Sequence, residues 1–273
     1  MAKFDGVLIC TDLDGTLLRN DKTVSKENRE AIEYFKREGG YFTFVTGRLP
    51  YYSHEAYNAV NPNAPFGSVN GGALYDGERG EYVKKCELSA GFVELIECID
   101  EKFPTVGIQV CCFDKTYFSK DNEAMVKFRA ATHLPRLVRS YREVSEPVAK
   151  IIFVTDDERE ILAVEGALRE HPLAHRFDFV RSERTLFEIL PKGVNKGLAI
   201  KNLVVHLGVK PEKTIAIGDY DNDVGMLREA GVGIAVANAS PSAREAADVI
   251  TVSNEEHAIA RVIYDLEAGV FGI

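Results

Sequence analysis

Two aspartates one residue apart end the first apolar run of the chain, in the stretch ICTDLDGTLL at residues 9–18. Side chains at positions i and i+2 of an extended chain share a face and lie roughly 6.6–7 Å apart. Carboxylates held that close repel each other unless a cation or a proton lies between them. The pair Asp12 and Asp14 therefore predicts a site in which a cation or a proton offsets the negative charge of the carboxylates.

Further polar residues follow other apolar runs of the chain. Thr46, Gly47 and Arg48 come after YFTFV, and the sequence GDYDND, residues 218–223, overlaps the end of TIAIG. Lys196 stands at the start of the predicted helix that precedes this second run. Ligand sites of open α/β sheets lie beyond the carboxyl ends of the strands, so we expect these groups in one crevice with the aspartate pair.

The carboxylates of this crevice predict a hard divalent cation with oxygen ligands. The candidates are Asp12, Asp14, Asp219, Asp221 and Asp223. An EF-hand loop that starts at Asp219 is excluded, because Val224 stands where its glycine is required and Ala230 where its glutamate is required. Mg²⁺ fits better, since it takes few carboxylates, keeps several waters and shares a substrate phosphate.

The hydroxyl and the cations suit a phosphoryl group. Thr46 and the Gly47 amide can donate hydrogen bonds to phosphate oxygens, and Lys196 can neutralise one of them. No cysteine is followed six residues later by arginine, as in cysteine phosphatases, and the chain has no Arg-His-Gly and no Gly-Lys dipeptide. A carboxylate is the remaining strong candidate for the nucleophile, through an aspartyl-phosphate.

The elements that must position these residues alternate at both ends of the chain. Residues 4–10 and 41–45 are predicted strands, separated by a helix that begins at Ser25 and stops at Gly39. From residue 195 the same alternation of helix and strand returns. This pattern predicts a parallel α/β core made from both ends of the chain.

The middle of the chain has a different pattern. FGSVNGGALYDGERGEYVKK, residues 66–85, contains short strands around an Asp76-Gly77 turn and predicts a hairpin. Beyond it, adjacent strands with helices between them, such as TVGIQVCCFD and TYFS, predict an α+β unit. We therefore predict a core of residues 1–82 and 189–273 and an inserted domain of residues 83–188.

In chain order, DLDGT, VTGR, Lys196 and GDYDND resemble the four motifs of the haloacid dehalogenase superfamily, and their spacing is similar to that of its Cof-type (IIB) phosphatases. The resemblance implies an α/β fold, with a Rossmann-like three-layer parallel-sheet core and an inserted α+β cap of the C2 type. The cap of that branch lies between the second and third motifs, where residues 83–188 lie here, and it is expected to set substrate specificity.

The resemblance also implies roles for the motif residues. Asp12 would be the nucleophile, and Asp14 would protonate the leaving oxygen and then activate water. The implied Mg²⁺ ligands are Asp12, the Asp14 backbone carbonyl and Asp219, with Asp223 in support. The implied phosphate-binding groups are the Leu13 amide, Thr46, Gly47, Lys196 and Asn222. Arg48 would either contact the substrate or pair with a carboxylate.

Composition excludes several other classes of protein. The 273 residues carry a formal net charge of −9, which disfavours nucleic acid and anionic membranes as partners. We expect neither a signal peptide nor a membrane span, because no apolar run is long enough. Five scattered cysteines predict no disulfide framework, and hence a cytoplasmic location.

These observations predict a Mg²⁺-dependent phosphatase of small phosphorylated metabolites, chiefly sugar phosphates. A phosphotransferase or phosphomutase would share the motifs, and a receiver-like signalling domain or a non-catalytic regulator that binds a phosphometabolite are further alternatives. Protein partners are not predicted. The cations of the insert that could meet a substrate or lie on the surface are His133, Arg136, Lys150 and Arg181.

Overall fold

The computed structural model of the chain describes residues 2–132 and 134–273, so His133 lies outside the described residues. The chain divides into two compact units. Unit 1 extends to Lys84 and resumes from Asn195 to Ile273, and unit 2 is Lys85–Val194. The predicted boundary after residue 188 falls inside a strand of unit 2 that continues to Pro191.

Unit 1 is built on a parallel sheet with the strand order β13-β12-β11-β1-β2. Its strands are β1 (Leu8–Thr11), β2 (Tyr41–Phe44), β11 (Thr214–Gly218), β12 (Val232–Ala235) and β13 (Val249–Ile250). Its helices are α1 (Lys26–Arg37), α2 (His54–Val60), α6 (Lys196–Leu207), α7 (Val224–Glu229), α8 (Pro241–Ala246) and α9 (Ala258–Glu267).

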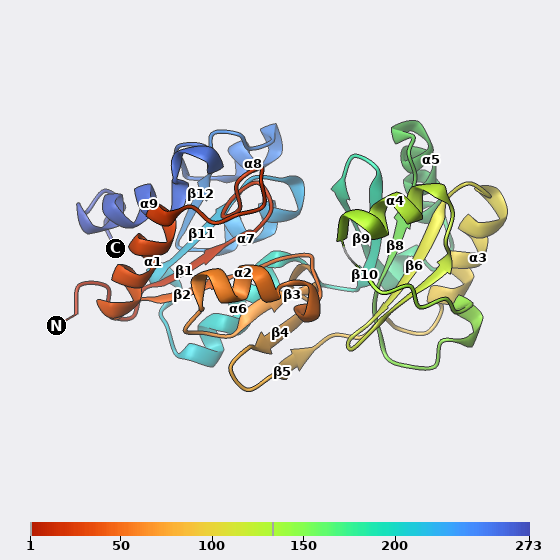
Figure 1. Cartoon of the computed structure of the whole chain (residues 1–273), viewed down its shortest axis with the longest axis horizontal. Coiled ribbons are helices and arrows are strands. Elements are labelled where there is room, and N and C mark those ends of the chain that lie inside the picture. The colour runs from red at the N-terminus through yellow and green to blue at the C-terminus, as the bar shows by residue number, and fades with distance from the viewer. Residues whose placement is uncertain (1, 133) are drawn as a thin grey trace. The chain divides into compact units, whose positions relative to one another are not determined.

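Helices cover both faces of this sheet, because successive side chains of a strand point to opposite faces. On β1, Ile9 packs into one apolar core with residues of α1 and α9 such as Phe35 and Ile263. Cys10 packs into another with residues of α6 and α7 such as Leu203. Figure 1 shows α1 beside α9 and the strands β1, β2 and β11 between the helices. The predicted three-layer parallel-sheet core is confirmed.

A small antiparallel sheet completes unit 1. It contains β3 (Phe66–Ser68), β4 (Ala73–Asp76) and β5 (Glu81–Lys85) in that order. The turn between β4 and β5 follows Asp76, so the predicted hairpin is confirmed. A 3-10 turn, Val69–Gly71, joins β3 to β4.

Unit 2 is an antiparallel sheet in the order β7-β6-β8-β10-β9 with helices. The strands are β6 (Gly107–Cys112), β7 (Thr116–Lys120), β8 (Val148–Val154), β9 (Phe177–Glu183) and β10 (Leu186–Pro191), and the helices are α3 (Phe92–Lys102), α4 (Glu123–Thr132) and α5 (Glu158–Arg169). Residues of α3 and α5 such as Ile96 and Val164 share one apolar core with Val110, Ile151 and Ile189 of the sheet. Unit 2 is therefore α+β, as predicted.

Helix length and the state of the cysteines bear on the predictions about membranes and disulfides. No helix within residues 2–132 and 134–273 is long and apolar enough to cross a membrane. The five cysteines are all free thiols, which agrees with the prediction that they form no disulfide framework.

Candidate active site

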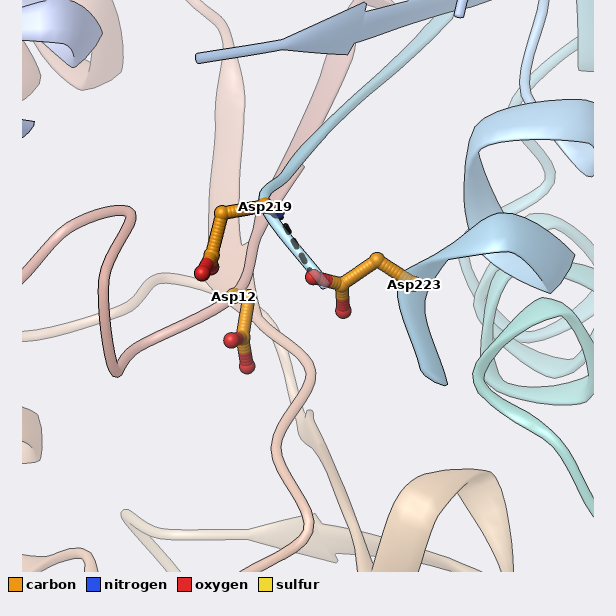
Figure 2. A group of neighbouring side chains, drawn as sticks. All are labelled: Asp12, Asp219 and Asp223. Atoms are coloured by element: carbon orange, nitrogen blue, oxygen red, sulfur yellow. Dashed lines mark hydrogen bonds between the residues drawn. The ribbon is translucent and has the colours of Figure 1, made fainter. Parts of the chain in front are cut away.

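Three carboxylates meet beyond the carboxyl ends of two neighbouring strands. Asp12 follows β1 and Asp219 follows β11, and these strands pair in parallel with Thr11 opposite Ile217. The Asp12 amide donates to the Ile217 carbonyl at 2.8 Å, which extends the pairing to the site. Oxygen atoms of Asp12, Asp219 and Asp223 all lie within 4.8 Å of one another. Figure 2 shows how the three side chains gather from these two loops.

The third carboxylate also shapes the loop that carries the second. Asp223 Oδ2 accepts hydrogen bonds from the amides of Asp219, at 2.8 Å, and Tyr220, at 2.9 Å; the first is the dashed line in Figure 2. Gly218 is required next to this turn, because a Cβ there would lie 2.6 Å from the Asp223 Cβ. The other oxygen of Asp223, Oδ1, accepts from the Lys196 ammonium at 2.5 Å.

Lys196 neutralises part of this charge. It is the first residue of α6, whose N-cap Asn195 accepts from the Leu198 amide. Its Nζ donates to Asp12 Oδ1 at 2.6 Å and to Asp223 Oδ1 at 2.5 Å, and the residue is only 1% exposed. Burial lowers the pKa of Lys196, but the two carboxylates outweigh it and raise the pKa above its ordinary value. The ammonium therefore stays charged, and three carboxylates with one ammonium retain two negative charges.

The remaining charge is costly in a buried site. Burial raises the pKa of Asp12 well above its ordinary value, and Asp223 and Asp219 add to this while Lys196 opposes it. Burial, followed by the charge of Asp223, raises the pKa of Asp219 to about 6. A bound divalent cation would reverse both effects. A group of oxygen donors with two residual negative charges thus fits a hard divalent cation.

The turn after β1 holds Asp219 in place. Thr16 Oγ1 donates to Asp219 Oδ1 at 2.6 Å. Gly15 has a φ of +81°, and a Cβ on it would lie 2.5 Å from Asp219 Oδ2. Thr16 was not assigned a role from the sequence, although it lies in the DLDGT motif. Gly15 and Thr16 therefore both help to orient Asp219, a candidate metal ligand.

The carboxylate of Asp14 lies outside the triad. Arg48 binds it with two nitrogens, Nε to Oδ2 at 3.0 Å and Nη2 to Oδ1 at 2.7 Å. Lys22 Nζ donates to Asp14 Oδ1 at 2.9 Å. Burial would raise the pKa of Asp14, but Arg48 and Lys22 outweigh it and hold the pKa below its ordinary value. Of the two alternatives predicted for Arg48, the structure shows the carboxylate pairing.

Lys22 was missed because nothing in its local sequence connects it with Asp14. It has a φ of +64° in the turn after β1, and Lys22 and Thr23 each form a backbone hydrogen bond with Arg19. A non-glycine residue in this left-handed region is uncommon and deserves a functional explanation. Its partner could be found only from the folded structure.

Three of the predicted phosphate-binding residues, Thr46, Gly47 and Asn222, lie beside one asparagine, Asn70. Thr46 Oγ1 accepts from the Arg48 amide at 3.2 Å. Asn222 Nδ2 donates to Asn70 Oδ1 at 3.2 Å, and a Cβ on Gly47 would lie 3.0 Å from the same oxygen. Asn70 is buried with a φ of +52° in the 3-10 turn after β3. The sequence signal for Asn70 was its Asn-Gly dipeptide, which was interpreted only as part of a hairpin.

Other predicted residues have different surroundings. The Leu13 side chain belongs to the apolar core, so only its main chain can serve a ligand. Asp221 is exposed, and its Oδ1 accepts from Ser240 Oγ at 3.0 Å. The side chains of Asp14 and Asp221 therefore lie outside the group of three carboxylates. The first is turned to Arg48 and the second to the serine beside it.

The described candidate cations of unit 2 are each in an ion pair within that unit. Arg136 pairs with Asp121, Lys150 with Glu188 and Arg181 with Glu158. Only the pair of Lys150 is buried on both sides. The pairs of Arg136 and Arg181 agree with the prediction of surface charges.

Comparison with known proteins gives one consistent family. The family model of haloacid dehalogenase-like hydrolases matches residues 9–263. The 5-amino-6-(5-phospho-D-ribitylamino)uracil phosphatase YitU of Bacillus subtilis is 30% identical over 263 residues, which cover 94% of this chain and 96% of the relative. The phosphatase YwpJ of the same species is 27% identical over 287 residues, which cover 95% and 99%.

A solved structure extends the likeness to the whole fold. The HAD subclass IIB sugar phosphatase BT4131 superposes with a TM-score of 0.83 and 24% identity, over 95% of this chain and 98% of that one. At this identity the likeness establishes the shared fold, including the inserted second unit.

Proposed function

This chain belongs to the haloacid dehalogenase-like hydrolase family, and from that membership we propose that it is a Mg²⁺-dependent phosphatase of small phosphorylated metabolites, chiefly sugar phosphates. The predicted family is confirmed, and the chain is a phosphatase like its named relatives. The metal, the sugar phosphate and an aspartyl-phosphate intermediate are the proposal.

One observation supports this proposal most directly. Asp12, Asp219 and Asp223 gather within 4.8 Å, and Lys196 bridges two of them. We assign Mg²⁺ to Asp12, the Asp14 carbonyl and Asp219, with Asp223 in support. Bound there, Mg²⁺ would neutralise the charge that develops on the phosphoryl oxygens.

The reaction that we propose has two steps. In the first, an Asp12 oxygen bonds to phosphorus, the bond from phosphorus to the leaving oxygen breaks, and Asp14 gives that oxygen a proton. Asp14 must leave its pairing with Arg48 and Lys22 to carry that proton. In the second, Asp14 takes a proton from water, the water oxygen bonds to phosphorus, and the bond to Asp12 breaks. Phosphate then leaves, with Asp12 again a carboxylate and Asp14 again protonated.

The phosphate is held, in this proposal, by donors that surround the nucleophile. Lys196 neutralises one phosphoryl oxygen, and the amides of Leu13 and Gly47 donate to others. Thr46 Oγ and Asn222 Nδ2 complete the set. The proposal also makes unit 2, Lys85–Val194, the cap that sets specificity, in place of the predicted range 83–188. It keeps the predicted cytoplasmic location.

The test is phosphate release from a panel of sugar phosphates, nucleotides and phosphorylated cofactors, with Mg²⁺ and with EDTA. The panel includes 5-amino-6-(5-phospho-D-ribitylamino)uracil, on which YitU is named to act. Asp12→Asn should abolish the release. Asp221→Asn is the matched control, because it removes a carboxylate of the same loop that lies outside the triad.

The alternatives have distinct outcomes in the same assay. Phosphate that moves to a sugar hydroxyl instead of water identifies a phosphotransferase or phosphomutase. Tight binding of a phosphometabolite without turnover identifies a regulator. Release that is unaffected by EDTA or by Asp12→Asn contradicts the proposed mechanism.

A further inference from the structure

The 3-10 turn Val69–Gly71 has a positive φ at three successive residues. The values are +55° at Val69, +52° at Asn70 and +91° at Gly71. Glycine adopts a positive φ readily and asparagine is enriched there, but a β-branched residue such as Val69 is a genuine outlier. Backbone strain of this kind persists only where the surrounding structure holds it, and it is concentrated at functional sites.

The β3–β4 hairpin alone does not require this conformation. Ser68 of β3 is opposite Ala73 of β4, so residues 69–72 form the connection. Connections of this length are most often built around a type I turn, whose two central residues have negative φ. The positive φ values of Val69 and Asn70 therefore need another explanation.

The main chain of the turn holds the loop after β2. The Val69 amide donates to the Arg48 carbonyl at 3.1 Å, and the Asn70 amide donates to the Thr46 carbonyl at 3.0 Å. The Thr46 carbonyl and the Gly47 amide belong to one planar peptide group, in which they point in opposite directions. The hydrogen bond from Asn70 therefore fixes the direction in which the Gly47 amide donates.

The side chain of Asn70 holds the turn after β11. Its Oδ1 accepts from Asn222 Nδ2 at 3.2 Å, and Asn70 is only 1% exposed. The amide group of Asn222 is planar, so a hydrogen bond from one of its two hydrogens also sets the direction of the other. The orientation of the Asn222 amide, which the proposed function assigns to phosphate binding, thus depends on Asn70.

Gly71 brings the same turn against the start of α6. A Cβ on Gly71 would overlap the carbonyl oxygen of Asn195, the N-cap residue that precedes Lys196. Only glycine leaves room for the two main chains to approach this closely. One turn therefore contacts three segments that carry proposed phosphate-binding groups, and all of them lie in unit 1.

We propose that Asn70 is a positioning residue for phosphoryl transfer, which aims the Gly47 amide through its main chain and the Asn222 amide through its side chain. The inference rests on the proposed function, and Asn70 acts through these two donors rather than on the substrate. Donors that are fixed before the reaction stabilise the charge that develops on the phosphoryl oxygens, because they need no reorganisation in the transition state. The strained turn is the means of fixing them.

The test compares Asn70→Gly with the native protein. Glycine readily adopts a φ of +52° and keeps the amide that donates to Thr46, so this variant removes the side chain alone. With p-nitrophenyl phosphate and Mg²⁺, kcat should fall about 10–100-fold while KM changes little, because a donor is misdirected in the transition state. The Kd for orthovanadate, a five-coordinate analogue of that state, should rise by the factor by which kcat/KM falls.

Two further variants separate positioning from folding. Asn61→Gly makes the same change at an exposed asparagine with a φ of +43°, at the C-cap of α2, and should leave kcat and orthovanadate binding unchanged. Asn222→Ala should lower kcat. Combined with Asn70→Gly, it should lower kcat by less than the product of the two separate factors, because both changes remove one hydrogen bond. The Kd for Mg²⁺ should be the same in Asn70→Gly as in the native protein.

The outcomes distinguish this inference from the proposed function. Native kcat and orthovanadate affinity in Asn70→Gly, or an equal fall in Asn61→Gly, overturns the inference. Independent effects of Asn70→Gly and Asn222→Ala also overturn it, as does a joint loss of Tm and Mg²⁺ affinity in Asn70→Gly, which indicates a structural role. Hydrolysis by the native protein upholds the phosphatase in each of these cases, whereas no release from any phosphate by the native protein overturns both.

Discussion

Replacing Gly15 by alanine would place a methyl group against the candidate metal site. A Cβ on Gly15 would lie 2.5 Å from Asp219 Oδ2, and Gly15 has a φ of +81°. The carboxylate is not free to move aside, because Thr16 Oγ1 donates to its other oxygen at 2.6 Å. We therefore expect Gly15→Ala to displace Asp219 and to weaken Mg²⁺ binding.

Gly15→Ala should have two separable effects, a loss of stability and a loss of Mg²⁺ affinity. Left-handed backbone costs alanine about 1–2 kcal/mol relative to glycine, which lowers the free energy of unfolding. Disturbing the residues that orient a metal ligand lowers metal affinity about 10–100-fold. Gly208→Ala is the matched control, because Gly208 has a φ of +67° and no heavy atom within 4 Å of the added Cβ. Gly208→Ala should show the loss of stability alone.

Isothermal titration with Mg²⁺ measures the loss of metal affinity, and thermal unfolding without metal measures the loss of stability. Both variants should unfold at a lower temperature than the native protein, and only Gly15→Ala should have a raised Kd for Mg²⁺. Equal Mg²⁺ affinity in the two variants would refute the argument that Gly15 makes room for Asp219.

Three other perturbations have defined outcomes. Thr16→Val removes the hydroxyl that donates to Asp219 and should raise the Kd for Mg²⁺ about tenfold or more in the same titration. EDTA should lower the Tm of the native protein but not that of Asp219→Asn, because Mg²⁺ stabilises only a fold that binds it. In unit 2, a hydrogen bond from Tyr117 lowers the pKa of Glu146 from 4.5 to about 2. Because the folded pKa of Glu146 is depressed, this stabilisation is present above pH 4.5 and is lost as the pH falls toward 2. Glu146→Gln lacks this titration, so its Tm should fall less steeply over that pH range than the Tm of the native protein.

The placement of the main site residues could be predicted because it depends on strand ends. Asp12 comes directly after β1, Thr46 lies two residues beyond β2, and Asp219 comes directly after β11. Apolar runs reveal buried strands, and the carboxyl ends of parallel strands meet at one edge of the sheet. The positions of these residues then follow from chain order and the parallel arrangement.

The partners of these residues could not be predicted in the same way. Lys22 and Asn70 are placed by left-handed backbone, with φ values of +64° and +52°, which apolar periodicity does not report. Asp14 was expected beside Asp12 on an extended chain, but β1 ends at Thr11 and the turn beyond it sends the carboxylate to Arg48. Such contacts depend on loop geometry that only the folded chain defines.

The boundary of the insert shows the same limit. The predicted break after residue 188 interrupts β10, whose residues up to Pro191 pair with β9. Apolar residues in LFEIL are compatible with either unit, so composition could not assign them. Pairing across the antiparallel sheet assigns the whole strand to unit 2.

The pairing of β1 with β11 has a consequence for synthesis on the ribosome. Cys10 lies opposite Ala216, and the whole of unit 2 is translated between them. At about 5–20 residues per second, β1 waits roughly 10–40 s for the neighbour that completes its pairing. Unit 2 is contiguous in the chain and can fold within that interval, whereas unit 1 must close around a finished insert. β1, which directly precedes the proposed nucleophile Asp12, must therefore wait for the segment translated after unit 2 before its sheet can be completed.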